Sequence, residues 1–255
     1  MKKIINLIFH ICLITSFFGI SGCNCSNDNS NNEKTIKDEE TFDFSNTSYM
    51  VFGDSITYGA DYSDGYKQMK TPYDIAVKNI LNLKSTTNKG ISGATFTRNN
   101  LGLTCMSDVI TSTTQHADII SVMGGVNDFN RNLPLGNIND NTPVTIYGSL
   151  NATMKYLKQQ YPNSYIFYMT PYKENYSGIL WSNKNYQGYN LEDVSNAIKQ
   201  VALVYDIDIL DMFKYGEFEN VMNNIDCDGI HPNQDFILEK TAPQIAKFIK
   251  ENYHK

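Results

Sequence analysis

Hydrophobic and polar positions follow two alternating patterns from about residue 47 to the end of the chain. Short apolar runs of strand length alternate with longer stretches in which apolar residues recur at helical spacing. The predicted strands are 48–53, 85–89, 117–123, 164–169 and 206–211, and the predicted helices are 72–83, 104–115, 145–160, 191–205 and 236–253. A strand–helix order repeated five times predicts an α/β domain with a doubly wound parallel sheet and helices on both faces.

The first residues break this pattern. Two lysines precede an apolar run over 4–20, which is typical of a secretory signal and too short and interrupted for a membrane span. The run ends in Ile20-Ser21-Gly22-Cys23, which resembles the lipobox of bacterial lipoproteins. We therefore expect residues 1–22 to be a lipoprotein signal peptide and Cys23 to carry lipid. The alternative is an ordinary signal peptide in which Cys23 has no role.

Residues 23–46 are rich in Asn, Ser and acidic residues and lack apolar periodicity. Such a composition predicts a disordered tether between the lipidated Cys23 and a folded domain over 47–255. The expected location is the bacterial cell envelope, after export across the inner membrane, with the domain on the periplasmic side or on the outer-membrane surface. The membrane is then a partner through the N-terminal anchor.

Charge and cysteine content narrow the function classes. The formal net charge of −6 argues against nucleic-acid binding, which needs clustered Lys and Arg. The sequence has five cysteines and no zinc-type spacing, so we expect no metal site. A disulfide between Cys105 and Cys227 is compatible with an exported protein, but the sequence leaves this pairing open. We expect the domain to be a monomer.

Polar motifs follow the predicted strands. Gly53-Asp54-Ser55-Ile56-Thr57 follows the first strand, Ser92-Gly93-Ala94-Thr95 the second and Gly124-Gly125-Val126-Asn127-Asp128 the third, and Asp228-Gly229-Ile230-His231-Pro232 lies near the C-terminus. Carboxyl ends of parallel strands meet at one edge of the sheet, where ligands bind. These four motifs should therefore converge.

In order and spacing, these motifs resemble the four blocks of the SGNH family of GDSL-type esterases and lipases, over about residues 48–251. The resemblance implies a three-layer, flavodoxin-like domain that needs no cofactor. It also implies catalytic roles for Ser55, Asp228 and His231, and an oxyanion hole formed by Ser55, Gly93 and Asn127.

The chemistry of these residue types supports those roles. A serine hydroxyl needs a base to take its proton, and a neutral imidazole such as that of His231 can do so near neutral pH. Asp228 would orient that ring, while two backbone amides and the Asn127 amide would stabilise the negative charge of the intermediate. Taken singly, each residue has a structural alternative, such as a helix cap or a loop contact. Asp54 and Asp128 are assigned structural support.

Substrate choice is less constrained. The loop after the fourth strand is long and aromatic, and Tyr172 and Trp181 are candidates to stack on sugar rings. The alternative is that these aromatic rings pack the loop onto the domain. We favour a short-chain acetyl ester on a carbohydrate, such as an acetylated glycan. Alternatives within the family are a lipase, a lysophospholipase or a thioesterase. Outside it, the alternatives are a non-catalytic glycan-binding lipoprotein and a metal-dependent phosphoesterase, which the lack of a His/Asp ligand cluster disfavours.

Overall fold

The computed structural model describes residues 42–214 and 228–253. The signal peptide, Cys23, most of the tether and Cys227 lie outside these residues, so their predicted roles stay predictions. Within the described residues, no helix is long and apolar enough to cross a membrane.

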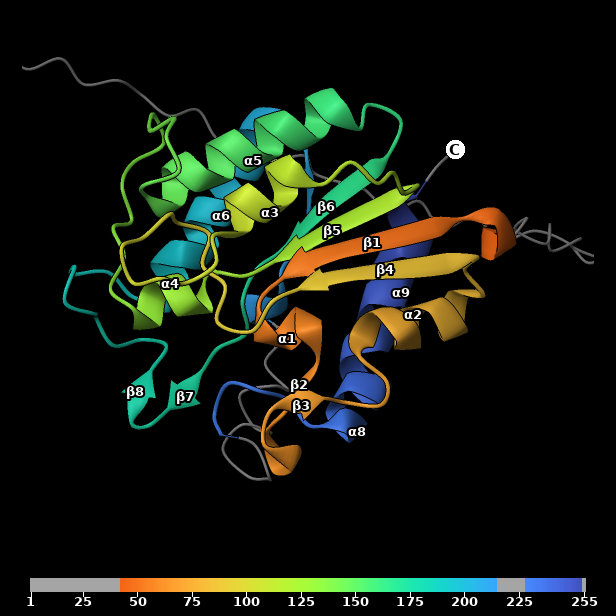
Figure 1. The fold of residues 1–255 in the computed structure, drawn as a ribbon, viewed down its shortest axis with the longest axis horizontal. Helices are drawn as coiled ribbons and strands as arrows, with labels where there is room; N and C mark the ends of the chain where they lie inside the picture. Colours follow the sequence, from red (N-terminus) through yellow and green to blue (C-terminus); the bar gives the residue numbers. More distant parts are fainter. Residues whose placement is uncertain (1–41, 215–227, 254–255) are drawn as a thin grey trace, which may run out of the picture. The chain divides into compact units, whose positions relative to one another are not determined.

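A five-stranded parallel sheet forms the centre of the domain (Figure 1). Its spatial order is β4-β1-β5-β6-β9, in which the second strand of the sheet along the chain lies outside the first. This is the flavodoxin-like order of a doubly wound sheet, and the predicted fold class is confirmed. The strands are β1 (Ser48–Gly53), β4 (Ser85–Gly90), β5 (Ile119–Met123), β6 (Tyr165–Met169) and β9 (Asp208–Leu210).

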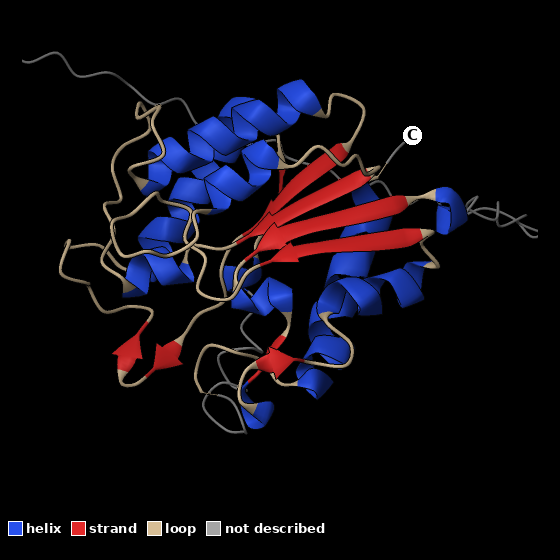
Figure 2. Ribbon diagram, in the orientation of Figure 1, coloured by secondary structure: helices blue, strands red, loops and turns tan. Residues whose placement is uncertain are grey.

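Helices cover both faces of this sheet (Figure 2). On one face lie α3 (Met106–Ser112), α5 (Ile146–Gln160) and α6 (Leu191–Tyr205), and on the other lie α2 (Tyr73–Leu81) and α9 (Ala242–Asn252). The shorter elements are helices α1 (Ser55–Tyr58), α4 (Val126–Asn130) and α8 (Gln234–Phe236), a π-helical turn (Ile237–Thr241), 3-10 turns (Phe44–Asn46, Tyr62–Asp64, Met212–Lys214) and the two-stranded pairs β2 (Ala60–Asp61) with β3 (Lys67–Gln68) and β7 (Asn175–Tyr176) with β8 (Ile179–Leu180).

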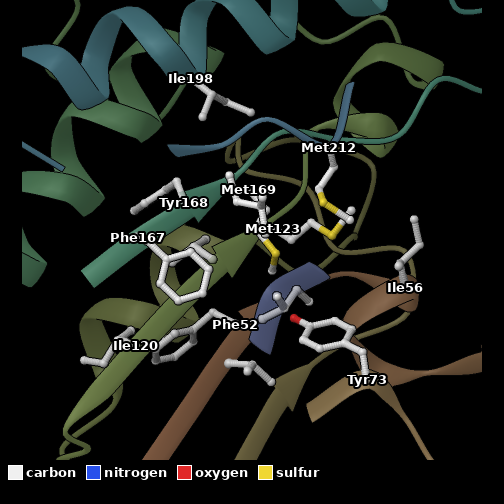
Figure 3. Close-up of a cluster of buried hydrophobic side chains, with 14 of the residues drawn as sticks. Phe52, Ile56, Tyr73, Ile120, Met123, Phe167, Tyr168, Met169, Ile198 and Met212 are labelled. Carbon is white, nitrogen blue, oxygen red and sulfur yellow. The ribbon is translucent and has the colours of Figure 1, made fainter. Parts of the chain in front are cut away.

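The core lies on both sides of the three central strands, β1, β5 and β6, whose residues are almost all buried. Gly53, Met123 and Met169 pair in register as the last residues of these strands. Figure 3 shows Met123 and Met169 beside Met212, which follows β9. Flexible thioethers fill irregular space well, and here they pack in the core next to the carboxyl edge of the sheet, which the polar motifs follow.

The folded domain begins earlier than the predicted boundary at residue 47. Phe44 was assigned to the tether but is 5% exposed, and its ring lies 4.8 Å from that of Phe42 and 5.7 Å from that of Tyr253. Burial of the Phe44 and Tyr253 rings outweighs the polar composition of the segment. The end of the 23–46 segment therefore belongs to the fold.

Candidate active site

Ser55 lies in the turn between β1 and α1 and is the first residue of that helix. The Asp54 carboxylate caps the helix by accepting a hydrogen bond of 3.0 Å from the Ile56 amide. Gly53 is needed at this tight reversal, because a Cβ atom there would lie 2.0 Å from Oγ1 of Thr57. The turn thus holds the Ser55 hydroxyl at the carboxyl edge of the sheet.

A continuous chain of hydrogen bonds joins Ser55, His231 and Asp228. The Ser55 Oγ lies 2.7 Å from Nε2 of His231, and Nδ1 of His231 lies 2.8 Å from an Asp228 carboxylate oxygen. Both Ser55 and His231 are buried, at 7% and 9% exposure. The structure therefore brings together the three residues for which the sequence predicts catalytic roles.

The Asp228 carboxylate is held in its ionised form. Partial burial alone would raise its pKa, but hydrogen bonds from the His231 ring and from the amides of His231 and Ile230 outweigh burial and keep the pKa well below its usual range. An anion at this place favours the tautomer of His231 with its proton on Nδ1, which leaves Nε2 free to accept the serine proton.

The loop that carries Asp228 and His231 is supported by the β7–β8 hairpin. Gly229 has a φ of +90°, and its carbonyl accepts a hydrogen bond of 3.0 Å from the Asn175 amide in β7. A Cβ atom on Gly229 would lie 2.0 Å from the Asn175 carbonyl oxygen. The backbone of β7 therefore fixes the distance between the hairpin and the loop.

Three hydrogen-bond donors belong to residues that line the cavity at Ser55. The amides of Ser55 and Gly93 donate no hydrogen bond to any described residue, and the Asn127 side chain, at the start of α4, uses one amide hydrogen to bond the Ala94 carbonyl at 3.0 Å. Its second hydrogen stays available. Ser55, Gly93 and Asn127 line the same cavity, which fits the expected oxyanion hole.

Asp54 and Asp128 are buried beside these residues and support loops. The Asp128 carboxylate accepts hydrogen bonds from the amides of Phe96 and Thr97 at 2.8 and 2.9 Å, which anchors the loop after Gly93 to α4. Burial raises the pKa of both aspartates to about 6. Their structural assignment agrees with these contacts.

The cavity at Ser55 has a volume of about 420 Å³. Besides the predicted residues, its lining includes Tyr66, Asn130, Arg131, Tyr176 and Ile179. Tyr66 donates a hydrogen bond of 3.0 Å to Asp228, and its ring lies 5.3 Å from the His231 ring. Partial desolvation and the Asp228 carboxylate raise the pKa of Tyr66 to about 12. No sequence motif marks Tyr66, whereas Tyr176 lies in the aromatic loop that the sequence singles out.

The two aromatic residues predicted to bind substrate do not line this cavity. Tyr172 is 2% exposed, and its hydroxyl lies 2.8 Å from that of Thr241 in the core. Trp181 is half-buried and packs edge-on against Phe213, with the Lys173 ammonium 4.6 Å from its ring centre. The prediction for Tyr172 was wrong, because its ring is buried in the core and holds the loop against the domain. Trp181 lies outside this cavity, and its contact with a sugar stays a prediction.

Two other features limit the chemistry of the described residues. Cys105 is buried, its Sγ lies 3.2 Å from the Phe96 carbonyl oxygen, and it pairs with no cysteine in the described residues. Its predicted partner Cys227 lies outside the described ranges, so that disulfide stays a prediction. Over residues 42–214 and 228–253, no group of three or more His, Cys, Asp or Glu side chains could hold a metal ion.

Comparison with known proteins gives a family and a fold. Comparison with curated proteins finds no match. A solved structure from Lactobacillus plantarum has a TM-score of 0.71 at 22% identity, covering 82% of this chain and 98% of its own. The structure of a possible lipase from Chitinophaga pinensis has a TM-score of 0.64 at 23% identity, covering 80% of this chain and 98% of its own. The structure of a carbohydrate acetylesterase from Sinorhizobium meliloti has a TM-score of 0.57 at 17% identity, covering 81% of this chain and 100% of its own.

At these identities the solved structures show a shared fold. The family assignment comes from a sequence model, which matches residues 51–235 and so includes the Ser55 motif, the Asn127 motif and the Asp228–His231 motif. This chain is therefore an esterase that belongs to the GDSL-like lipase/acylhydrolase family.

Proposed function

We propose that this esterase forms an acyl-enzyme on Ser55, with His231 as general base and Asp228 as its orienting partner. The observation that carries the proposal is the chain of two short hydrogen bonds, 2.7 and 2.8 Å, through the His231 ring. Proton transfer in catalysis requires contacts of this length between nucleophile and base.

The reaction follows from the geometry. As the Ser55 oxygen attacks the ester carbonyl, His231 Nε2 takes the hydroxyl proton, and the imidazolium that forms lies against the Asp228 carboxylate. The carbonyl oxygen becomes an oxyanion, which the Ser55 and Gly93 amides and the Asn127 side chain would stabilise. Collapse breaks the ester C–O bond, and His231 returns the proton to the leaving alcohol. A water molecule, activated by the same ring, then releases the acid and regenerates Ser55.

We propose a short acyl group, most simply acetyl, on a carbohydrate alcohol. The cavity at Ser55 is open and bordered by Asn130, Arg131, Tyr66 and Tyr176, which suit hydroxyl-rich ligands better than a long alkyl chain. The carbohydrate acetylesterase of Sinorhizobium meliloti, with the same fold, supports this choice.

The test is a comparison of chain lengths. The full chain, purified in a nonionic detergent, is assayed on 4-nitrophenyl esters from acetate to palmitate and for acetate release from acetylated xylan. We expect acetate to be cleaved fastest and Ser55→Ala to lose all measurable activity. A preference for palmitate would assign a lipase instead. Equal inactivity of the folded wild type and Ser55→Ala would contradict an esterase and favour a glycan-binding lipoprotein.

We also propose that Cys23 anchors the protein in the bacterial cell envelope, facing the periplasm or the exterior. The support is the sequence alone, in which a signal-like segment ends at Ile20-Ser21-Gly22-Cys23. Labelling with radioactive palmitate in a bacterial host tests this. The wild type should take up label and sediment with membranes, whereas Cys23→Ala should do neither.

A further inference from the structure

A second cavity adjoins the one at Ser55. It has a volume of about 310 Å³, and Asn130 and Ile179 line both cavities. Its other walls come from α4 and from the segment after β8, which includes Asn183, Lys184 and Tyr186. An acetyl group alone needs far less room than the two cavities offer. We call the two adjoining cavities together the groove. The groove suits a substrate that extends well beyond the ester.

Two cations line the groove. Arg131 lines the cavity at Ser55 and Lys184 lines the second, and neither forms an ion pair with a carboxylate in residues 42–214 or 228–253. Asp228 is the one carboxylate among the described lining residues, and it is already bound by His231 and Tyr66. The groove is therefore positive, although the whole chain has a formal net charge of −6.

Arginine is rare in this chain, which makes Arg131 notable. The sequence has two arginines among 21 basic residues. The other, Arg98, is used in an exposed ion pair with Asp108 and lines neither cavity. A guanidinium binds a carboxylate through two parallel hydrogen bonds, which an ammonium cannot do. An unpaired guanidinium beside the nucleophile points to an anionic group close to the ester.

The second cavity has the side chains that bind sugars. The Tyr186 ring is 97% exposed and forms part of the wall, so one ring face is open to stack on a pyranose. Asn132 and Asn183 add side-chain amides that can bond to hydroxyl groups, whereas the amides of Asn130 and Asn185 are already bound within the protein. A lipid headgroup would use the cations but would leave these two amides and the Tyr186 ring without a role.

We infer that the substrate is an acidic oligosaccharide or polysaccharide, in which Arg131 binds a carboxylate on the sugar near the ester and Lys184 binds one on a more distant residue. This inference rests on the proposed function and names its substrate class. Long-range repulsion by the net negative charge does not prevent such binding, because at physiological salt it is screened beyond about 8 Å.

The test uses inhibition, so that the position of the acyl group in the natural substrate does not matter. Hydrolysis of 4-nitrophenyl acetate by the full chain is measured with tetragalacturonate or with its methyl ester, which has the same sugars without the charge. We expect the acid to bind about tenfold more tightly than the ester, as expected for two partly exposed charge contacts. Added salt should reduce this ratio.

Variants separate the roles of the side chains that line the groove. Arg131→Gln and Lys184→Gln should each lower the acid-to-ester ratio about threefold, and the double variant should bring it close to one. Tyr186→Ala should weaken both inhibitors equally. Arg98→Gln, which removes the other arginine, is the matched control and should keep the wild-type ratio.

Three results would overturn the inference. Equal inhibition by acid and ester, or no inhibition by either, would mean that the groove does not select acidic sugars. Inhibition by lysophosphatidylglycerol but not by tetragalacturonate would assign the cations to a lipid headgroup. In each case Ser55-dependent hydrolysis of 4-nitrophenyl acetate would leave the proposed esterase mechanism standing. A wild-type protein that does not hydrolyse 4-nitrophenyl acetate at all would instead contradict the proposed function itself.

Discussion

Glu174 is a buried acid whose raised pKa should lower the stability of the fold at neutral pH. It precedes β7 and is 2% exposed, and one carboxylate oxygen accepts a hydrogen bond of 2.8 Å from the Asn130 side chain. Burial raises the pKa of Glu174 from 4.5 to about 8, and the nearby charges of Asp228 and Asp54 act in the same direction. The other Glu174 oxygen and the Asn130 Oδ1 are buried and have no hydrogen-bond partner in the part of the chain that the structure describes.

Replacing Glu174 with glutamine removes the titratable group and keeps the shape of the side chain. The glutamine oxygen can still accept from Asn130, and its NH₂ group can donate to the unpaired Asn130 Oδ1. A pKa change from 4.5 to about 8 corresponds, at about 1.4 kcal/mol per pKa unit, to roughly 5 kcal/mol of lost stability above pH 8 and about 3 kcal/mol at pH 7. Glu174→Gln should recover much of this loss.

The raised pKa of Glu174 also determines the direction in which stability changes with pH. Between pH 4.5 and 8 the folded protein keeps the Glu174 proton and the unfolded chain has released it, so wild-type stability falls as pH rises. Below pH 4.5 both states are protonated and the cost disappears. The gain from Glu174→Gln should therefore be small at pH 4.5, grow through pH 7 and level off above pH 8.

Urea unfolding followed by circular dichroism at pH 4.5, 7 and 8.5 measures this gain. Glu239→Gln, which changes an exposed glutamate, is the matched control and should give no pH-dependent gain. A stability difference between wild type and Glu174→Gln that is the same at every pH would refute the reasoning. A variant less stable than wild type at pH 8.5 would refute it as well.

Three further predictions concern the site. Asn127→Ala should lower kcat by about 10² to 10³ with little change in KM, since it removes an oxyanion donor, and unchanged kcat would remove Asn127 from that role. Gly229→Ala should reduce kcat at least tenfold in a protein with a normal circular dichroism spectrum, because the loop must move away from the Asn175 carbonyl; wild-type activity would show that the hairpin contact is dispensable. Asp128→Asn should cost about 1 to 3 kcal/mol in urea unfolding, since one of its two backbone acceptor contacts is lost, and an unchanged midpoint would contradict this.

Much of the fold follows from hydrophobic periodicity. β1 and α6 begin and end where the pattern predicts, because their burial is complete along one face or throughout. The short helices α1 and α4 were not predicted, since four or five residues give too little periodicity to recognise. The predicted helices over 72–83 and 104–115 extend past the observed ends at Leu81 and Ser112, where tertiary contacts and turns decide the boundary.

The candidate site could be predicted where it depends on strand ends. Ser55, Gly93 and Asn127 follow strands whose carboxyl ends must meet, and the Asp228–His231 motif has a recognisable spacing. The rest depends on how loops fold over that edge. Tyr172 was misassigned because an aromatic ring in a loop can equally bind a ligand or fill the core, and here its ring is buried in the core.

The β7–β8 hairpin joins the loop that carries the general base to the wall between the two cavities. Its base holds Gly229 through the Asn175 amide, and its far strand places Ile179 in the lining of both cavities. Ser177 and Gly178 form the tip, both with positive φ, so most other residues there would strain the turn. For laboratory evolution of new specificity, diversity belongs at Tyr176 and Ile179, which flank the tip and line the cavity at Ser55, whereas exchange of the whole hairpin would also disturb the contact with the loop of the general base.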